Sequence, residues 1–247
     1  FKNRESLNAT KLTDVQASLE VVNEEPITGD VTYPNTKEIK QRIFDTFPTQ
    51  NRAVTQADYE NIAYRMHSKF GAIKRCSVQK DLDSQKRNLN MYIVSEDTAG
   101  KLTLANSTIK NNLKTWLNQY RMINDTIDIL DPYILNFGIN FVVKPQKMAD
   151  KFIIIDRCVE ALREHFEQPL FIGEALYISD IYEVLKNVAG VLDVVKVKVF
   201  LKSGGLYSTA SIDIDKNISP DGSYLACPNN AIFELKFPDV DIVGRVR

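Results

Sequence analysis

The chain has 247 residues, of which 44% are hydrophobic and 26% are charged, and its formal net charge is -1. This composition is sufficient for a real apolar core, in one large domain or a few small ones. The near-neutral balance argues against a strongly basic nucleic-acid or anionic-membrane binder. It also permits close association between copies of the chain, because long-range repulsion is weak.

Cysteine usage and the opening residues give two further expectations. Cys76, Cys158 and Cys227 are widely spaced, which is typical of reduced thiols and not of a disulfide framework. No apolar run reaches the roughly 18 residues that span a bilayer. The chain begins at Phe1 with neither an initiator Met nor a signal-peptide pattern, so we expect the C-terminal part of a longer polypeptide.

The first segment combines a polar stretch with a short helix. Residues 1–34 are weakly periodic, and we interpret them as an arm or the end of a preceding domain. A helix is predicted over 36–47, because Asn35 can cap it and every fourth residue from Ile39 to Phe47 is apolar.

A second helix is predicted to begin at Thr55, whose spacing from Asp58 is that of a capping box. Apolar residues recur at helical intervals as far as Phe70. Gly71 follows, where a left-handed residue commonly ends a helix.

Alternation of apolar and polar residues indicates the next elements. Strands are predicted over 72–79 and 88–95, joined by an exposed hairpin loop at 80–87. A helix over 107–121 and a strand over 126–130 follow.

The clearest strand of the sequence follows Asp131-Pro132. From Tyr133 to Val143, every second residue is apolar, which predicts one buried and one wetted face. A long helix over 149–167 follows, with an apolar stripe formed by Phe152, Ile155, Val159, Leu162 and Phe166. A shorter helix over 179–188 precedes a strand in which valines alternate with lysines.

The predicted fold class is α+β, with tandem small helix-backed modules of mixed or antiparallel sheet and a β-rich C-terminal segment. The element order is strand-strand-helix-strand, then strand-helix-helix-strand. The boundaries predicted from it are an arm with a short helix at 1–50, a first module at 51–145, a second module at 146–205 and a C-terminal segment at 206–247.

A search for chemistry finds no catalytic constellation. His67 and His165 lack the partners at short spacing that a metal site needs. A helix-loop-helix calcium loop starting at Asp213 would need Gly and Glu where Ile218 and Tyr224 stand. No phosphate-binding glycine loop and no Gly-x-Ser-x-Gly elbow occurs. We therefore expect no metal, no cofactor and no catalytic residue.

Two rival interpretations stay open at this point. Tandem α+β modules with aromatics on a strand are typical of some RNA-binding sheets, in which Phe137 and Phe141 would stack on bases. The two residues share a parity with core-like apolar residues, and the net charge is unfavourable. The other rival is an enzyme subunit whose site lies before residue 1.

One segment resembles a known family. The run Arg52-Ala53-Val54-Thr55-Gln56-Ala57-Asp58-Tyr59, after the turn at Gly29-Asp30 and a short helix, is similar to the baseplate J-like family of contractile tail machines. The family often shows Gly-Gly in that turn. The stretches at 172–177 and 188–191 extend the resemblance, which covers most of residues 20–202. Within the family, the chain looks most like wedge proteins of T-even-type contractile-tailed bacteriophages.

The resemblance implies a structural component of a contractile-tail baseplate wedge, not an enzyme. It implies that copies dimerise and join neighbouring wedges into a ring around the hub. The implied partners are other copies of the chain, other wedge proteins and hub proteins, with no nucleic acid and no membrane. The implied location is the virion tail baseplate, after assembly in the host cytoplasm.

The candidate fold or assembly residues are those of the motif. Thr55 and Asp58 can satisfy the free amides at a helix start, and Tyr59 would pack behind them. Arg52 lies just before the helix and could bind an acidic side chain or backbone carbonyls. For contacts between copies, we expect the arm 1–34, the loop 80–87 and strand edges within 206–247.

Overall fold

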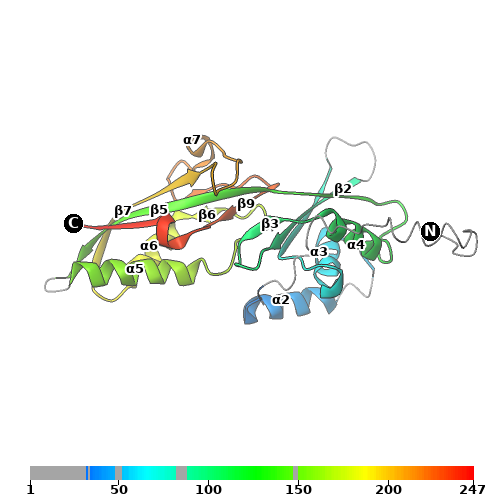
Figure 1. Ribbon diagram of the computed structural model, residues 1–247, viewed down its shortest axis with the longest axis horizontal. Coiled ribbons are helices and arrows are strands. Elements are labelled where there is room, and N and C mark those ends of the chain that lie inside the picture. Colours follow the sequence, from blue (N-terminus) through cyan, green and yellow to red (C-terminus); the bar gives the residue numbers. More distant parts are fainter. Residues whose placement is uncertain (1–31, 33, 48–51, 82–87, 147–149) are drawn as a thin grey trace, which may run out of the picture.

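The computed structural model describes residue 32 and residues 34–47, 52–81, 88–146 and 150–247. Figure 1 shows an elongated molecule in which two sheets follow one another along the long axis, with helices beside each. The predicted α+β class is confirmed. Within the described ranges, no helix is both long and apolar enough to cross a membrane.

The first sheet has four strands, namely β1 (Arg75–Lys80), β2 (Asn88–Glu96), β3 (Leu102–Leu104) and β4 (Thr126–Leu130). β1 and β3 run antiparallel to β2, and β4 runs parallel to it. The predicted strands at 72–79, 88–95 and 126–130 are present with slightly shifted ends. β3 was not predicted, because three residues are too few to show a periodicity. Most of the hairpin loop, 82–87, lies outside the described residues.

Two helices pack on the first sheet, α3 (Gln56–Tyr64) and α4 (Ser107–Leu117). The core between helices and sheet contains the fully buried side chains of Tyr59, Ile62, Ile109, Leu113, Leu117, Met91 and Ile93. Trp116 Nε1 donates a hydrogen bond of 2.8 Å to the carbonyl of Ile62. This bond ties α4 to α3, so the two helices and the sheet form one packed unit.

The helix predicted from Thr55 is shorter than its apolar pattern indicates. α3 ends at Tyr64, His67 adopts an extended backbone (φ -65°, ψ 136°), and a 3₁₀ turn, η3 (Ser68–Phe70), follows. His67 Nδ1 accepts a hydrogen bond of 3.1 Å from the Lys69 amide, and this local bond competes with continuation of the helix. Phe70 is consequently 51% exposed, so its prediction as a member of the helical apolar stripe was wrong.

The second sheet is formed by β5 (Tyr133–Pro145), β7 (Val191–Lys202), β9 (Ala231–Glu234) and β10 (Ile242–Val246). β7 pairs antiparallel with β5, whereas β9 and β10 pair parallel with different parts of it. Among the described residues β5 is the only strand that pairs with β7, so β7 is an edge strand. The register of this pairing shifts between Val142 and Val143 of β5, which pair with Lys196 and Val194 of β7. The intervening residue of β7, Val195, is left unpaired and marks a bulge.

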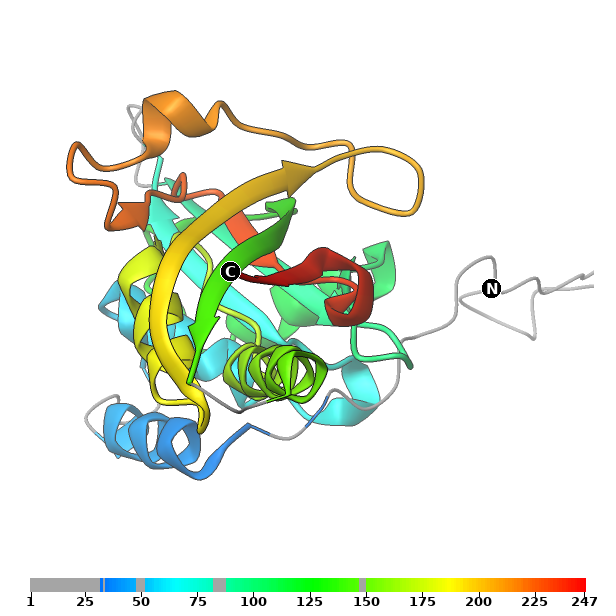
Figure 2. The ribbon, with the colours of Figure 1, turned by 90° about the vertical axis from the view of Figure 1, so that its left-hand side faces the viewer.

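Two helices support this sheet, α5 (Lys151–His165) and α6 (Ile178–Lys186). In Figure 2, α5 is seen end-on beside the strands, and β7 curves along the outer side of the sheet. The remaining short elements are β6 (Leu176–Tyr177), β8 (Tyr224–Leu225), α7 (Ile214–Asn217) and α8 (Pro238–Asp241). β6 and β8 pair antiparallel as a separate two-stranded sheet.

The buried face predicted for β5 is confirmed, but the predicted wetted face is exposed only at Asn140 and Lys144, because Asn136 and Gly138 are buried as well. Leu135, Phe137, Ile139, Phe141 and Val143 are each at most 1% exposed. The first apolar position differs, since Tyr133 is 61% exposed at the beginning of the strand.

The stripe predicted for the long helix is confirmed at Val159, Leu162 and Phe166, which lie in or against the core, but it is wrong at the beginning of the helix. Ile154, Cys158 and Leu162 are its buried residues, whereas Phe152 is 79% exposed. Residues 152–155 are four consecutive apolar residues, so helical periodicity alone cannot select which of them faces the sheet. The inward stripe therefore begins two residues later than predicted. Residue 149 of the predicted helix lies outside the described residues.

The two sheets meet at an apolar junction. A small cluster between them consists of Val94, Leu102, Ile134, Ile172 and Ile232. Sheet pairing changes between β4 and β5, at Asp131-Pro132, whereas the boundary proposed from the sequence at 145/146 falls after β5. β9 and β10, from the 206–247 segment, pair with β5. The C-terminal segment thus contributes two strands to the second sheet.

Candidate assembly surfaces

The helix start at 55–59 has the geometry that its sequence predicts. Thr55 Oγ1 accepts a hydrogen bond of 3.2 Å from the Asp58 amide, and Asp58 Oδ2 accepts bonds of 2.8 Å from the Thr55 amide and 3.1 Å from the Val54 amide. This is a complete capping box. Burial raises the pKa of Asp58, but these hydrogen bonds outweigh it and leave the pKa below its ordinary value.

Tyr59 anchors the same helix to residues 122–125, which precede β4. Its side chain is 1% exposed, its hydroxyl donates to Asp125 Oδ2 at 2.8 Å, and it accepts from the Met122 amide at 3.3 Å. Burial and the bond to Asp125 raise the pKa of Tyr59 to about 12. Arg52 is exposed and, in the part of the chain that the structure describes, forms no ion pair. Three motif residues thus hold the fold together, and Arg52 lies apart at the surface.

A buried arginine joins three segments that are distant in sequence. Arg75, on β1, has a side chain that is 2% exposed. Its guanidinium donates to the carbonyls of Pro169 (2.7 Å from Nη2), Leu170 (3.3 Å from Nε) and Lys74 (3.2 Å from Nη1). Its Nη1 also lies 3.0 Å from Glu38 Oε1, on α2 (Thr36–Thr46).

Arg75 therefore clamps α2 and the connection after α5 to the first sheet. The guanidinium also lies over the ring of Phe171, 4.4 Å from its centroid. The fork of five donors suits this task, since one planar group can bind several acceptors at once. Arg75 belongs to no motif of the sequence. Its only signal is a charge at the start of a predicted buried strand.

A second polar cluster links the sheets through a carboxylate. Glu234, on β9, accepts from the Leu102 amide at 2.7 Å and from Asn136 Nδ2 at 2.7 Å. Asn136 Oδ1 in turn accepts from the Ser208 amide at 2.8 Å. Burial raises the pKa of Glu234, although these hydrogen bonds oppose the rise. All of these groups satisfy one another, which is the arrangement of a structural network.

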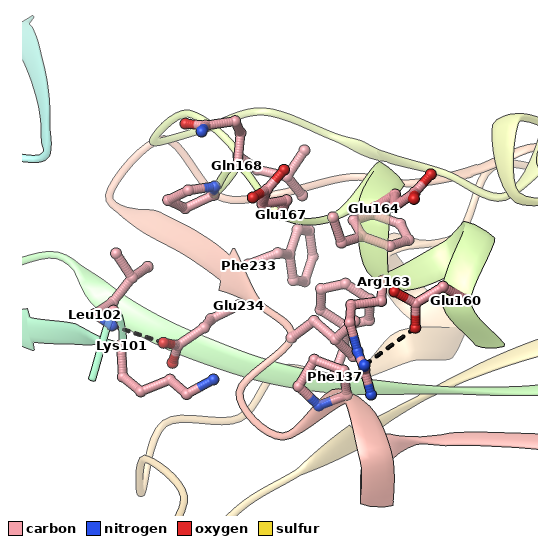
Figure 3. A pocket seen from close by; sticks show the side chains of 16 residues that line it. Lys101, Leu102, Phe137, Glu160, Arg163, Glu164, Glu167, Gln168, Phe233 and Glu234 are labelled. Atoms are coloured by element: carbon pink, nitrogen blue, oxygen red, sulfur yellow. Dashed lines mark hydrogen bonds and ion pairs between the residues drawn. The ribbon is translucent and has the colours of Figure 1, made fainter. Parts of the chain in front are cut away.

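A pocket of about 400 Å³ lies beside this cluster, between α5, the 167–170 connection, β9 and residues 100–102. Figure 3 shows Glu160, Glu164 and Glu167 around it, with Glu234 bonded to the Leu102 amide. Its described lining contains no Ser, Thr, Cys, His or Tyr side chain, so it offers no hydroxyl, thiol or imidazole nucleophile. The described residues hold no group of three or more His, Cys, Asp or Glu placed to bind a metal.

The cysteines and the strand aromatics are equally unsuited to chemistry. Burial raises the pKa of the Cys158 and Cys227 thiols to about 11, and burial also raises the pKa of Cys76 well above its ordinary value. Such thiols carry little of the thiolate that reacts. Phe137 and Phe141 are 1% exposed, so they cannot stack on the bases of an RNA strand.

The class defined by these observations is an α+β chain with two helix-backed sheets in series, locked together by buried polar clusters. No protein-family model matches the sequence, and no curated protein matches it. Among solved structures, the fold is similar to a chain of the anti-feeding prophage baseplate, determined by cryo-EM with sixfold symmetrisation. The TM-score is 0.50 at 9% sequence identity.

That similarity covers 82% of this chain and 42% of the other, so this chain spans less than half of the length of its structural neighbour. At this identity the similarity concerns the fold. It agrees with the coarse part of the sequence resemblance, which is a baseplate fold.

Proposed function

We propose that this chain is a structural component of a contractile-tail baseplate wedge, which self-associates and joins wedges into a ring around the hub. The observation that carries the proposal is the baseplate fold, which extends over 82% of the chain. The Arg52 to Tyr59 run supports it independently, because this run resembles the baseplate J-like family. Other wedge proteins and hub proteins are the proposed partners, and the virion tail is the proposed location.

The internal chemistry of the chain supports a scaffold without enzymatic activity. Arg75 and Glu234, two of its buried charged residues, are bonded to backbone groups or to other side chains. Fully satisfied networks of this kind rigidify a fold, so they fix how one sheet is held against the next. The burial of Phe137 and Phe141 counts against the RNA-binding alternative.

The direct test is the composition of purified tails. Tails from the host that carries this gene are disassembled into baseplates and tubes, and each fraction is analysed by quantitative mass spectrometry. We expect the chain in the baseplate fraction at a fixed ratio to the other wedge proteins. Its absence from intact tails would refute the proposal. Binding of single-stranded RNA that weakens with rising salt would favour the alternative instead.

A further inference from the structure

The helix α2 is attached to the molecule by its polar side. Its inward positions are Glu38, which pairs with Arg75, and Arg42, whose guanidinium lies 3.9 Å from the centroid of the Tyr64 ring. None of its residues is buried. Figures 1 and 2 show α2 at the periphery of the molecule, and it contacts α3. An ordinary surface helix has the opposite arrangement, with its apolar stripe toward the core.

The apolar stripe of α2 faces solvent. Ile39 is 42% exposed, Ile43 65%, Phe44 74% and Phe47 89%. Residues 39, 43 and 47 repeat at intervals of four, so they form one continuous row on the helix. Together, the four side chains expose on the order of 500 Å² of apolar surface. That value is near the upper end for the largest patch of a monomeric protein, and such patches commonly mark an interface.

The position of this stripe is fixed by the structure. Asn35 Oδ1 caps the helix by accepting from the Glu38 amide at 2.8 Å. The bond from Arg75 to Glu38, and the stacking of Arg42, then set the rotation of the helix about its axis. The apolar row therefore points outward before any partner arrives, which reduces the entropic cost of binding.

We propose that this row is the contact with a second copy of the chain, with the two α2 helices packed antiparallel about a twofold axis. The proposal rests on the self-association proposed above and names its surface. Two such faces would bury about 1,000 Å² in total, which is the smallest area expected of a specific interface. The row is self-complementary in this arrangement, because its central residue, Ile43, meets its own copy while Ile39 meets the far end of the other row.

Charge favours the antiparallel arrangement. Lys37 and Lys40 are exposed in the first half of the helix, whereas the acidic residues Glu38 and Asp45 are half-buried toward the body. Antiparallel packing places each pair of lysines near the C-terminal end of the other helix, where free carbonyls carry partial negative charge. A parallel pair would instead place the lysines of the two copies side by side.

The test is the change of mass with concentration in sedimentation velocity, for the whole chain and two matched variants. Ile43→Asp places two carboxylates at the twofold axis, and we expect self-association to weaken by at least about 30-fold, as at an interface hot spot. Leu206→Asp is the control, since Leu206 is 77% exposed and lies outside α2. This variant should associate like the parent.

A cross-link gives a second measurement that does not depend on loss of binding. Ile43→Cys should form a disulfide-linked dimer under mild oxidation, because the residue nearest the axis meets its own copy. Leu206→Cys should not exceed the background of the parent chain, whose Cys227 is half-buried. Cross-linking at 43 but not at 206 would support the proposal.

Each other outcome overturns it in a distinguishable way. Self-association unchanged in Ile43→Asp would refute the α2 contact and leave the proposed baseplate role intact. A monomer at every concentration, with a lower urea midpoint in Ile43→Asp, would mean that residues 1–31 cover the face. A monomer at every concentration, with an unchanged urea midpoint in Ile43→Asp, would mean that a different protein binds the face. Absence of the chain from purified tails would refute the proposed function whatever α2 does.

Discussion

Replacing Arg75 by Met tests whether the fold depends on the clamp. The variant leaves Glu38, whose side chain is 10% exposed, with Arg42 as its remaining ion-pair partner, and it removes the donors that bind Pro169 and Leu170. Removing one member of a buried ion pair typically costs about 3–5 kcal/mol. We expect a loss in this range, which is a large part of the 5–15 kcal/mol that typically stabilises a domain.

The measurement is urea unfolding followed by the fluorescence of Trp116, the single tryptophan, which packs against Tyr120 in the first module. Arg163→Met is the matched control, because its ion pairs with Glu160 and Asp239 are both largely exposed. We expect a loss of less than about 1 kcal/mol there.

Two further variants keep the test decisive if Arg75→Met does not fold. Arg75→Lys retains the charge but not the planar fork, so it should be less destabilising than Arg75→Met. The double variant Arg75→Met with Glu38→Met removes both charges and should recover at least about 1 kcal/mol relative to Arg75→Met. Equal losses in Arg75→Met and Arg163→Met would refute the reasoning.

Tyr59→Phe removes the hydroxyl that binds Asp125, and we expect a loss of about 1–3 kcal/mol in the free energy of unfolding. Asp58→Ala breaks the capping box and should cost about 1 kcal/mol at neutral pH. The pKa of Asp58 is lowered, so this difference should be complete at neutral pH and vanish as the pH falls below the ordinary aspartate value of 3.8. Glu60→Gln should be neutral or stabilising at neutral pH, because burial raises the pKa of Glu60. The protonated carboxyl of Glu60 stabilises the fold fully at a pH below the ordinary glutamate pKa of 4.5. This contribution is lost as the pH rises through the raised pKa.

All three variants are compared with the parent by urea unfolding across a pH series. Asp58→Asn is the control for the cap, since asparagine also accepts hydrogen bonds from amides. A parallel pH dependence of the parent and Asp58→Ala would contradict the assignment of the low pKa. A large loss in Glu60→Gln at neutral pH would show that the charged form is needed.

Local patterns were sufficient for much of the fold. The capping box at Thr55 and the buried row of β5 from Leu135 to Val143 are both visible in local sequence patterns, and both are present in the structure. The features that could not be predicted from the sequence depend on contacts between residues that are distant in the chain. Arg75 bonds to Glu38, which lies 37 positions before it, and to Pro169, which lies 94 positions after it. Nothing in the sequence around Arg75 indicates either partner.

The face of α2 shows a different limit of sequence analysis. The row from Ile39 to Phe47 was recognised as one face of a helix, and its regular spacing is typical of a core. Periodicity identifies a face but not what lies against it. In α2 the polar side is held by Glu38 and Arg42, so the apolar row is left outward. The three contact regions expected from the sequence did not include this helix.

The outer edge of β7 has a consequence for the proposed association of copies. Free strand edges invite any other strand to pair, and a component made in many copies would then join in the wrong order or form aggregates. Here the edge strand is bulged at Val195, and Lys196 and Lys198 are exposed along it. Strand addition at this edge is thereby discouraged. Under the proposed function, newly made chains stay separate in solution until a complementary side-chain surface joins them in the correct order.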